Sequence, residues 1–248
     1  MSRALHTLVI TNDFPPREGG IQTFVYELVR RFDPATVTVL VSSYEGDLEF
    51  DQAQSFRIVR ADTQVLLPTA ETAKLARQLI VETGATRVIF GASAPLGLLA
   101  KQLRKLGVEH IVAFSHGHEA GWAITPVMRS ALRRIGNSVD VVTYLGEYTR
   151  SKISPAFSPR AQTAMRQLAP AVDPEVFHPR NKEQAVQLRQ DRNLADKKLI
   201  VCVSRLMPRK GQDQLIAAMP DIVAQVPDAQ LVIVGAGSYE DKLHRSAA

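Results

Sequence analysis

The stretch HTLVITNDFPPREGGIQTFVYELVRRF, residues 6–32, contains the clearest indication of the fold class. Its apolar start, HTLVITN (6–12), predicts a buried β-strand. Two prolines, two charged residues and the pair Gly19-Gly20 then form a loop, and the periodic run 20–32 predicts an amphipathic helix. A strand that leads directly into a helix is the unit from which parallel α/β sheets are built.

The same alternation continues along the chain to about residue 169. Further strands are predicted at 36–43, 56–61, 87–92, 109–116 and 139–146, with a shorter candidate at 163–169. Helices are predicted at 69–84, 94–107, 124–136 and 147–157, and the first three end at candidate C-cap glycines, Gly84, Gly107 and Gly136. Because continuously apolar strands alternate with helices, we expect a doubly wound α/β domain whose parallel strands are buried on both faces.

The alternation stops over 169–196, which contains three prolines, many charges and no predicted strand. It then resumes with a strand, a helix and a second strand at 197–206, 212–227 and 229–237. A sheet this small leaves an apolar face uncovered. The sequence therefore predicts three parts: an N-terminal Rossmann-like domain (1–168), a linker with one short helix (169–196), and the truncated start of a second Rossmann-like domain (197–248).

Composition and charge narrow the class of protein. The 248 residues are 45% hydrophobic, and the single cysteine, Cys202, is expected to be a buried strand residue rather than a catalytic thiol. No apolar run approaches the roughly 18 residues of a membrane span, and the N-terminal run is too short for a signal-peptide core. A net charge of +5 favours anionic partners: nucleotide phosphates, an acidic membrane surface or nucleic acid. Nucleic-acid binding is disfavoured because no recognised motif is present and aromatic residues make up only 6%.

The glycine pair Gly19-Gly20 lies where a strand end meets a helix start. The first N–H groups of a helix have no intrahelical partner, and glycine lets a phosphate approach them closely. The alternative is that the pair serves only the turn, because it does not match the G-x-G-x-x-G pattern of dinucleotide-binding folds.

The stretch AFSHGHEAGW (113–122) follows another predicted strand and carries His116, His118 and Glu119 at its end. Ligands of open α/β sheets bind at the carboxyl ends of the strands. A metal site is disfavoured because H-x-H lacks a third ligand in any nearby motif. We therefore prefer a histidine that donates a hydrogen bond or stabilises charge, and the alternative is a structural histidine that caps the next helix.

The stretch VSRLMPRKGQDQL (203–215) places Arg205, Arg209 and Lys210 at a turn before a helix. Fixed cations beside a helix N-terminus suit a diphosphate, and a charge directly after an apolar strand is costly without a partner. The alternative is a solvated basic loop. The next strand ends in VIVGAGSYEDKL (232–243), and its G-x-G could line the same crevice.

Taken together, these stretches resemble glycosyltransferase family 4, whose members are retaining enzymes of GT-B architecture. The resemblance covers all 248 residues, including PAVDPEVFHP (170–179) in the linker, and its most specific part is R-L-x-x-R-K-G (205–211) followed by V-G-x-G (234–237). NDFPPREGGIQ (12–22) together with SHGHE (115–119) looks most similar to actinobacterial phosphatidylinositol mannosyltransferases, in particular those that use GDP-mannose and act on phosphatidylinositol monomannoside.

The resemblance implies catalytic roles for His118, Arg205 and Lys210. His118 rather than His116 would hydrogen-bond the donor sugar. Arg205 and Lys210 would hold the diphosphate and stabilise it as the leaving group, so that two side-chain cations replace a metal. The sequence has no D-x-D motif, no Ser-His-Asp pattern and no P-loop, which agrees with a metal-independent transfer through an oxocarbenium-like state.

The resemblance also implies the binding partners. The donor would be GDP-mannose, bordered by Gly19, Gly20, Gly235 and Gly237 as well as by the two cations, with no cofactor. The acceptor would be a phosphatidylinositol mannoside lipid, reached by peripheral contact with anionic membrane at the cytoplasmic face of the plasma membrane. Basic residues on two predicted helices are candidates for that contact, and a solvated helix face is an equal alternative: Lys74, Arg77, Arg129, Arg133 and Arg134.

One departure from the family pattern is large. The donor domain of the family continues further and carries a Glu-x7-Glu element, which is missing here; Glu175 and Glu183 have that spacing by chance, within the linker. We therefore expect a fragment with little or no transferase activity on its own. Two alternatives remain open: a family 4 transferase with another donor or a soluble acceptor, and a non-catalytic α/β binding remnant.

Overall fold

A computed structural model describes residues 5–178 and 182–247. Residues 179–181, in the middle of the predicted linker, lie outside the described residues. The chain divides into two compact units, Met1–Ala171 and Val172–Ala248. We describe each unit by itself.

Unit 1 is built on a parallel sheet with strand order β3-β2-β1-β4-β5-β6-β7, seven strands within the described residues. Every neighbouring pair is parallel, which confirms the predicted doubly wound α/β class. The strands are β1 (Thr7–Thr11), β2 (Val37–Ser42), β3 (Arg57–Ala61), β4 (Arg87–Phe90), β5 (His110–Phe114), β6 (Val141–Tyr144) and β7 (Arg166–Gln167).

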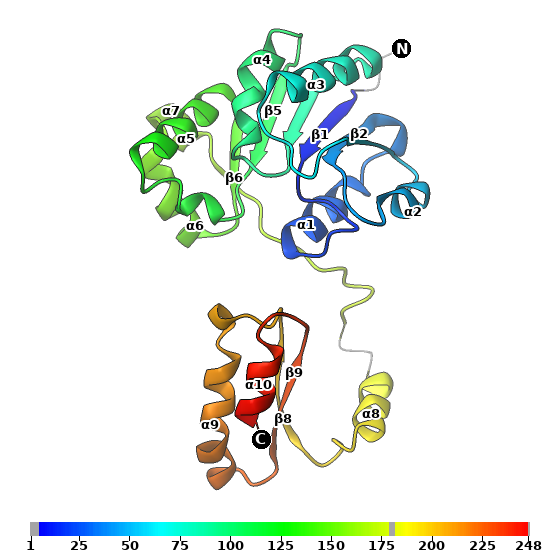
Figure 1. Cartoon of the computed structure of the whole chain (residues 1–248), viewed down its shortest axis with the longest axis vertical. Coiled ribbons are helices and arrows are strands. Elements are labelled where there is room, and N and C mark those ends of the chain that lie inside the picture. Colours follow the sequence, from blue (N-terminus) through cyan, green and yellow to red (C-terminus); the bar gives the residue numbers. More distant parts are fainter. Residues whose placement is uncertain (1–4, 179–181, 248) are drawn as a thin grey trace. The chain divides into compact units, whose positions relative to one another are not determined.

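Helices cover both faces of this sheet (Figure 1). They are α1 (Gly20–Val29), α2 (Asp47–Gln52), α3 (Ala70–Thr83), α4 (Ala100–Arg104), α5 (Pro126–Ser138), α6 (Glu147–Ile153) and α7 (Pro159–Thr163). Helix α2 was not predicted, because its six residues are too few to show a helical period.

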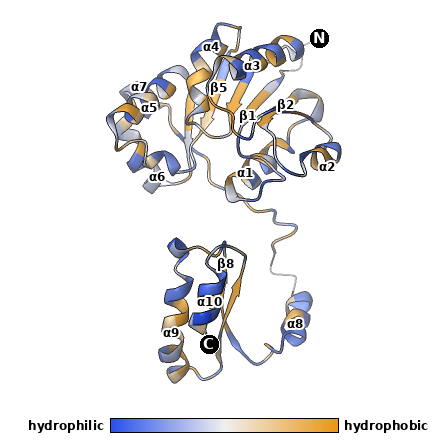
Figure 2. Ribbon diagram, in the orientation of Figure 1, coloured by the Kyte–Doolittle hydropathy of each residue, from blue (hydrophilic) through white to orange (hydrophobic). Residues whose placement is uncertain are grey.

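Strand β1 explains why the sheet is buried on both faces. Leu8 and Ile10 lie in a large core cluster that also contains residues of α3, α4 and α5. Val9 points to the opposite face and lies in a second cluster with Val25 and Val29 of α1. Because successive side chains of a strand alternate in direction, one apolar run fills both cores. The strands are correspondingly the most hydrophobic elements of the unit (Figure 2).

The three glycines predicted as helix C-caps have different roles. Gly84 caps α3 in the left-handed conformation (φ 66°), as predicted, and Gly107 also has a positive φ of 91°. The prediction was wrong for Gly136, which lies inside α5. A Cβ atom there would lie 2.5 Å from Cδ1 of Phe157, so glycine is needed for close packing rather than for a turn.

Unit 2 contains a two-stranded parallel sheet with helices. Its elements are α8 (Lys182–Asp191), β8 (Lys198–Val203), α9 (Gln212–Gln225), β9 (Ala229–Val234) and α10 (Glu240–Ala247). Val201, Val203 and Val234 are exposed, so one face of the sheet is uncovered, as expected for so few strands. Cys202 is half-buried, which corrects the prediction of a buried strand residue, because the small sheet covers it incompletely.

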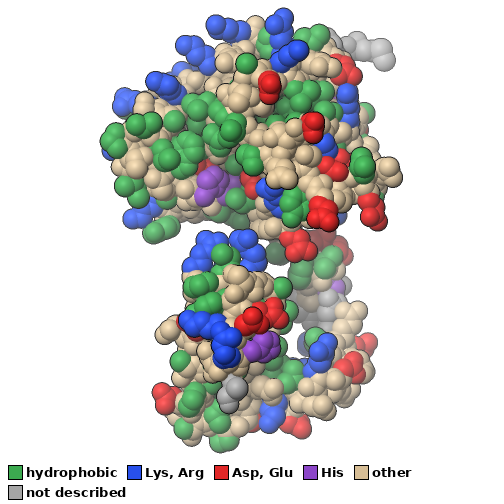
Figure 3. All heavy atoms as spheres, viewed as in Figure 1, with side chains coloured by type: hydrophobic (Ala, Val, Ile, Leu, Met, Phe, Trp, Pro, Cys, Tyr) green, Lys and Arg blue, Asp and Glu red, His purple; other side chains and the backbone are tan. Residues whose placement is uncertain are grey.

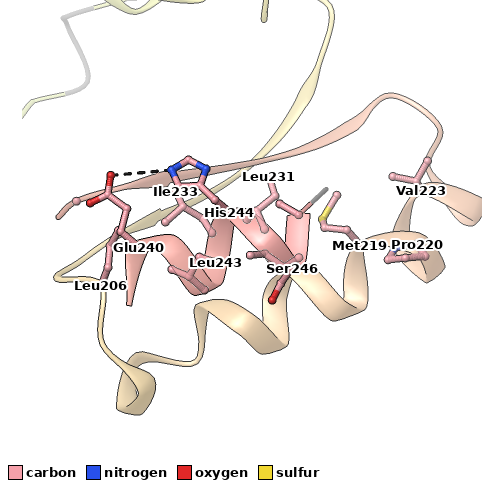
Figure 4. A pocket seen from close by; sticks show the side chains of 13 residues that line it. Leu206, Met219, Pro220, Val223, Leu231, Ile233, Glu240, Leu243, His244 and Ser246 are labelled. Atoms are coloured by element: carbon pink, nitrogen blue, oxygen red, sulfur yellow. Dashed lines mark ion pairs between the residues drawn. The ribbon is translucent and has the colours of Figure 1, made fainter. Parts of the chain in front are cut away.

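The other face of this sheet borders a pocket of about 780 Å³ between β9, α9 and α10. Leu231, Ile233 and Leu243 line it, and His244 Nε2 lies 3.9 Å from Glu240 Oε1 beside them (Figure 4). The lining is mostly apolar, and Gly235 is the one predicted donor-binding residue among the described lining residues. Within the described residues, no helix combines the length and the apolar character that crossing a membrane requires.

Candidate functional site

The candidate site of unit 1 lies at the carboxyl ends of β1, β4 and β5. Strand β1 pairs with β2 on one side and with β4 on the other, so the strand order reverses beside it. A reversal of this kind opens a crevice at the carboxyl ends of the strands, where ligands of such sheets bind. The loops after these three strands carry polar residues, among them Asp13, Ser93 and His118.

The two glycines at the start of α1 differ in their surroundings. Gly19 has φ 157°, a value that favours glycine, and a Cβ atom there would lie 2.2 Å from Gln22 Oε1, so the Gln22 side chain would have to move. At Gly20 a Cβ atom would meet no atom within 4 Å. No side chain caps the helix. The first N–H groups of α1 are therefore open to a ligand in front of Gly20, while glycine at position 19 is favoured by its backbone conformation.

The loop between β1 and α1 is held from two sides. Asn12 Nδ2 donates to the carbonyl of Leu66 (2.9 Å), and its Oδ1 accepts from the N–H of the same residue (2.6 Å). Arg60 donates to the carbonyl of Pro15 (2.8 Å) and forms a two-point ion pair with Asp51 of α2. The unpredicted helix α2 thus helps to fix the loop that precedes Gly19.

His116 has a structural environment. Its Nε2 atom lies 2.7 Å from the carbonyl oxygen of Gly91, and the ring packs edge-on against Phe24 and Phe114. Burial lowers the pKa of His116 below its ordinary value of 6.5, although the Gly91 hydrogen bond and the Glu119 carboxyl oppose this. A neutral imidazole that donates to Gly91 agrees with the expectation that His116 is the less likely histidine to contact the donor sugar.

Acidification is expected to destabilise unit 1 through His116. Between its lowered pKa and 6.5 the unfolded chain binds more protons at this residue, so its contribution to stability falls as pH drops below about 6.5. Asp13 has the opposite effect. Because its pKa is raised above the ordinary value of 3.8, its contribution to stability increases as the pH falls toward 3.8. We therefore expect His116→Gln to lose less thermal stability than the wild type between about pH 7 and pH 5. An equal loss of melting temperature in both proteins would contradict the assignment.

His118 begins a short 3-10 turn, η3 (His118–Ala120), and its side chain is exposed by 42%. Its Nε2 atom lies 3.6 Å from Oε1 of Glu119, which is exposed by only 1%. Ser93 Oγ donates to Oε1 of this carboxyl (2.7 Å), and Ser115 Oγ (2.9 Å) and Gly117 N–H (3.2 Å) donate to Oε2. A rigid buried carboxyl group thus supports an accessible imidazole.

Asp13 is a second acidic group at this edge. Gln22 Nε2 donates to its Oδ1 atom (2.8 Å), and Thr11 Oγ1 accepts from its N–H (2.9 Å). Burial raises the pKa of Asp13, and the nearby imidazoles of His118 and His116 act against this rise. The β1 and β5 loops therefore place a carboxyl group and two imidazoles close together.

Sequence reasoning did not select several members of this cluster as site residues. Glu119 was considered only as a metal ligand, although it is the buried support of His118. A usable signal was present, because polar residues directly after buried strands need partners. The residues concerned are Asp13, Gln22, Ser93, Ser115 and Glu119.

In unit 2, Arg205 and Lys210 lie in the turn between β8 and α9. Lys210 ends the 3-10 turn η5 (Pro208–Lys210), and Gly211, with φ 71°, is the N-cap residue of α9 and provides no side-chain cap. Both cationic side chains are exposed. The burial cost expected for Arg205 is therefore absent, because its side chain leaves the strand end toward solvent. The turn combines two accessible cations with an uncapped helix N-terminus, a combination that attracts anions.

Gln212 fixes this turn from inside. Its side chain is fully buried, and its Nε2 atom donates to Ser204 Oγ and to the carbonyl of Arg205, both at 3.0 Å. Its Oε1 atom is buried without a partner among the described residues. The backbone of Arg205 is thus held in place while its side chain remains free to bind.

Gly235 and Gly237 have a clear packing role. Gly235 has φ 152°, and a Cβ atom there would lie 2.0 Å from the carbonyl oxygen of Ser204. Gly237 has φ 156°, and a Cβ atom there would lie 2.3 Å from the carbonyl oxygen of Leu206. Leu206 N–H donates to the carbonyl of Ala236 (2.9 Å). The two glycines therefore let the β9 loop lie against the turn that carries Arg205, and a donor contact by either remains a prediction.

Replacing Gly237 by alanine is expected to destabilise unit 2 by about 3 kcal/mol or more, because both a backbone clash and an unfavourable φ result. Gly211→Ala is the matched control, since Gly211 has φ 71° but open space around its Cβ position, and it should cost only about 1–2 kcal/mol. Urea unfolding of both variants measures the difference. Equal destabilisation would mean that the loop moves to accommodate the new methyl group.

Across residues 5–178 and 182–247, no group of three or more His, Cys, Asp and Glu side chains has the geometry to hold a metal ion. The metal independence implied by the resemblance stays a prediction.

Two family models match the chain. The glycosyl transferase 4-like domain matches residues 19–169, and the group 1 glycosyl transferases match residues 184–248. The first match begins at Gly19 and includes α1 and the His118 turn, and the second includes Arg205, Lys210 and both glycines of the β9 loop.

Curated relatives align along the whole chain. A GDP-mannose-dependent alpha-(1-6)-phosphatidylinositol monomannoside mannosyltransferase of Mycolicibacterium smegmatis is 45% identical over 248 residues, 97% of this chain and 63% of the relative. A GDP-mannose-dependent monoacylated alpha-(1-6)-phosphatidylinositol monomannoside mannosyltransferase of Corynebacterium glutamicum is 40% identical over 250 residues, 100% of this chain and 65% of the relative. The chain thus spans less than two thirds of the length of these relatives.

Solved structures share the fold at low sequence identity. Anabaena Alr3699/HepE in complex with UDP has a TM-score of 0.75 at 16% identity, over 98% of this chain and 65% of that one. An alpha,alpha-trehalose-phosphate synthase (UDP-forming) from Burkholderia vietnamiensis has a TM-score of 0.58 at 13% identity, over 97% and 67%. Together with the family match over residues 19–169, these relatives establish that the chain belongs to the glycosyl transferase 4-like family and has the GT-B fold.

Proposed function

We propose that this chain is part of a retaining, metal-independent mannosyltransferase that moves mannose from GDP-mannose to a phosphatidylinositol mannoside lipid. The observation that carries the proposal is the 45% identity, along 97% of the chain, to the M. smegmatis enzyme named for this donor and acceptor. The residues at the carboxyl ends of the strands in both units fit that chemistry.

The proposed leaving group is GDP, whose β-phosphate gains negative charge as the bond to the anomeric carbon breaks. Arg205 and Lys210 stabilise this charge, aided by the uncapped N-terminus of α9. His118 donates a hydrogen bond to the sugar, and Glu119 keeps its ring in place. The open N–H groups at Gly20 donate to a phosphate or sugar oxygen without a side chain in the way.

The proposed acceptor is a lipid head group, so we place the reaction at anionic membrane, at the inner face of the plasma membrane. Support comes from the start of α5, where Ile124 and Val127 are each 82% exposed and Arg129 and Arg133 follow. Apolar residues beside cations favour binding to an anionic bilayer. Flotation with anionic vesicles tests this: Val127→Ser should bind less well, and Val81→Ser, exposed on α3, should not change.

Calorimetry tests the donor proposal. GDP-mannose and UDP-glucose are titrated separately into the 248-residue chain and into the complete gene product. Tight binding of GDP-mannose, without comparable binding of UDP-glucose, supports the proposal. Preference for UDP-glucose would indicate another family 4 transferase, and binding of neither would indicate a non-catalytic remnant. In the same titration Gly20→Ala should fold normally and bind GDP-mannose roughly tenfold more weakly, as for the loss of one charge-assisted hydrogen bond.

A further inference from the structure

A basic pocket lies at the edge of the unit 1 sheet opposite to the candidate site. It has a volume of about 1030 Å³ and is formed by the end of α4, the end of α5, the start of β6 and helix α7. Its charged lining consists of Lys101, Arg104, Arg134, Arg160 and Asp140. Lys and Arg side chains gather along the side of unit 1 where these helices lie (Figure 3).

The pocket is separate from the residues assigned to sugar transfer. Asp140 directly precedes β6, and Glu109, whose carbonyl accepts from Arg104, directly precedes β5. His116 and His118 follow the other end of β5. Since β5 has five residues, the two edges are about 13 Å apart at least, by the rise per residue of a strand.

Only one of the four cations is paired. Arg104 donates to Asp140 Oδ1 (2.6 Å), and the N–H of Ile111 donates to Oδ2 of the same carboxyl (2.7 Å). Burial raises the pKa of Asp140, but these two hydrogen bonds outweigh it and the pKa is lowered, so this carboxyl group stays ionised and neutralises Arg104. Lys101, Arg134 and Arg160 form no ion pair with any described residue.

The remaining three cations share one concave surface. Asn137 also lines it; its Oδ1 atom accepts from Ser158 Oγ (2.5 Å), which leaves its amide N–H groups as donors. Like charges that gather without a compensating carboxyl group repel each other unless an anion joins them. Guanidinium groups and an amide donor together match the oxygen atoms of a phosphate.

From this arrangement we propose that the pocket binds a phosphate-bearing anion, through Lys101, Arg134, Arg160 and Asn137. The volume exceeds that of a phosphate alone, so the ligand class is a phosphorylated organic molecule. The same chemistry is offered by a soluble phosphate compound and by the head group of an anionic phospholipid. The site is independent of the donor site and of the proposed transfer reaction.

The test uses the full chain in an Arg205→Gln, Lys210→Gln background, so that the turn before α9 does not bind the probe. Pyrophosphate is titrated by calorimetry, and binding is also measured by flotation with vesicles of phosphatidylcholine alone or with added phosphatidylglycerol. The test variant is Lys101→Gln, Arg134→Gln, Arg160→Gln. The control removes three exposed cations that have no assigned binding role, as Lys182→Gln, Arg192→Gln, Lys197→Gln.

The expected result is a loss of roughly a hundredfold in affinity for the test variant and little change for the control, since each cation near an anionic surface contributes about a factor of five. Binding of pyrophosphate identifies a soluble ligand, and binding confined to anionic vesicles identifies a lipid head group. Both variants should keep the circular dichroism of the wild type. No binding of either probe, or an equal loss in both variants, would overturn the proposal.

Discussion

We expect replacement of both Arg205 and Lys210 by alanine to abolish measurable GDP-mannose binding and to lower mannosyl transfer by roughly three orders of magnitude or more. Removal of a single group that stabilises developing negative charge commonly costs a factor of about 10²–10³ in enzymes. Both side chains are exposed and Gln212 holds the turn through the carbonyl of Arg205, so the fold should survive the change. Calorimetry and an assay of radiolabelled transfer by the complete gene product provide the measurements.

Arg209 supplies the matched control. It lies in the same 3-10 turn as Lys210, is equally exposed and carries the same charge, but it is not assigned to the diphosphate. Arg209→Ala should therefore lower transfer by less than about tenfold, the effect expected of general electrostatic attraction alone. If Arg209→Ala matches the double variant, the turn acts through its net charge and the specific roles of Arg205 and Lys210 are wrong.

A conservative single variant separates the charge of Lys210 from the geometry of its side chain. Lys210→Arg keeps the charge but replaces a compact ammonium group by a planar one, so its effect reports the geometry of the contact. A loss of kcat with little change in KM would place the interaction in the transition state, whereas a rise in KM alone would place it in donor binding.

The order of strands and helices could be predicted from the sequence because each element carries its own period. The apolar run of β1 and the periodic run of α1 are local signals, and the packing of Leu8 and Val9 into opposite cores follows from alternation alone. Helix α2 and Gly136 were misjudged for a related reason. A six-residue helix shows no period, and the need for glycine at 136 comes from Phe157, a contact made only in the folded chain.

The candidate site was predictable only in part. Gly20, Arg205 and Lys210 lie at strand–helix turns that the pattern marks, whereas Glu119 depends on contacts across 26 residues to Ser93. Such a contact has no local signal. The local sequence shows an acidic residue beside two histidines, which suggests a metal ligand, but in the structure the buried Glu119 carboxyl group accepts three hydrogen bonds and lies 3.6 Å from His118 Nε2.

The buried carboxyl group of Glu119 is expected to contribute both to the stability of unit 1 and to activity. Glu119→Ala should destabilise unit 1 by about 3–5 kcal/mol, because it leaves a cavity and two buried hydroxyl groups without their acceptor. Glu119→Gln keeps the shape of the side chain and replaces one carboxyl oxygen by an amide nitrogen. The hydroxyl group of Ser93 can rotate to accept a hydrogen bond from this new amide group. This variant should fold, with a cost of about 1–2 kcal/mol. Thermal and urea unfolding measure both costs.

The glutamine variant separates structure from function. It removes the negative charge that lies 3.6 Å from His118 Nε2, so the imidazole loses the group that orients it. We expect transfer by the folded Glu119→Gln protein to fall about tenfold to a hundredfold, the size typical for loss of a residue that orients a site side chain. Glu18→Gln, an exposed carboxyl group in the β1–α1 loop, is the control and should leave activity unchanged. If Glu119→Gln retains full activity, Glu119 stabilises the fold and His118 needs no support from it. If it loses activity only as far as it loses folded protein, the same conclusion holds, because a positioning role requires a loss that exceeds the loss of structure.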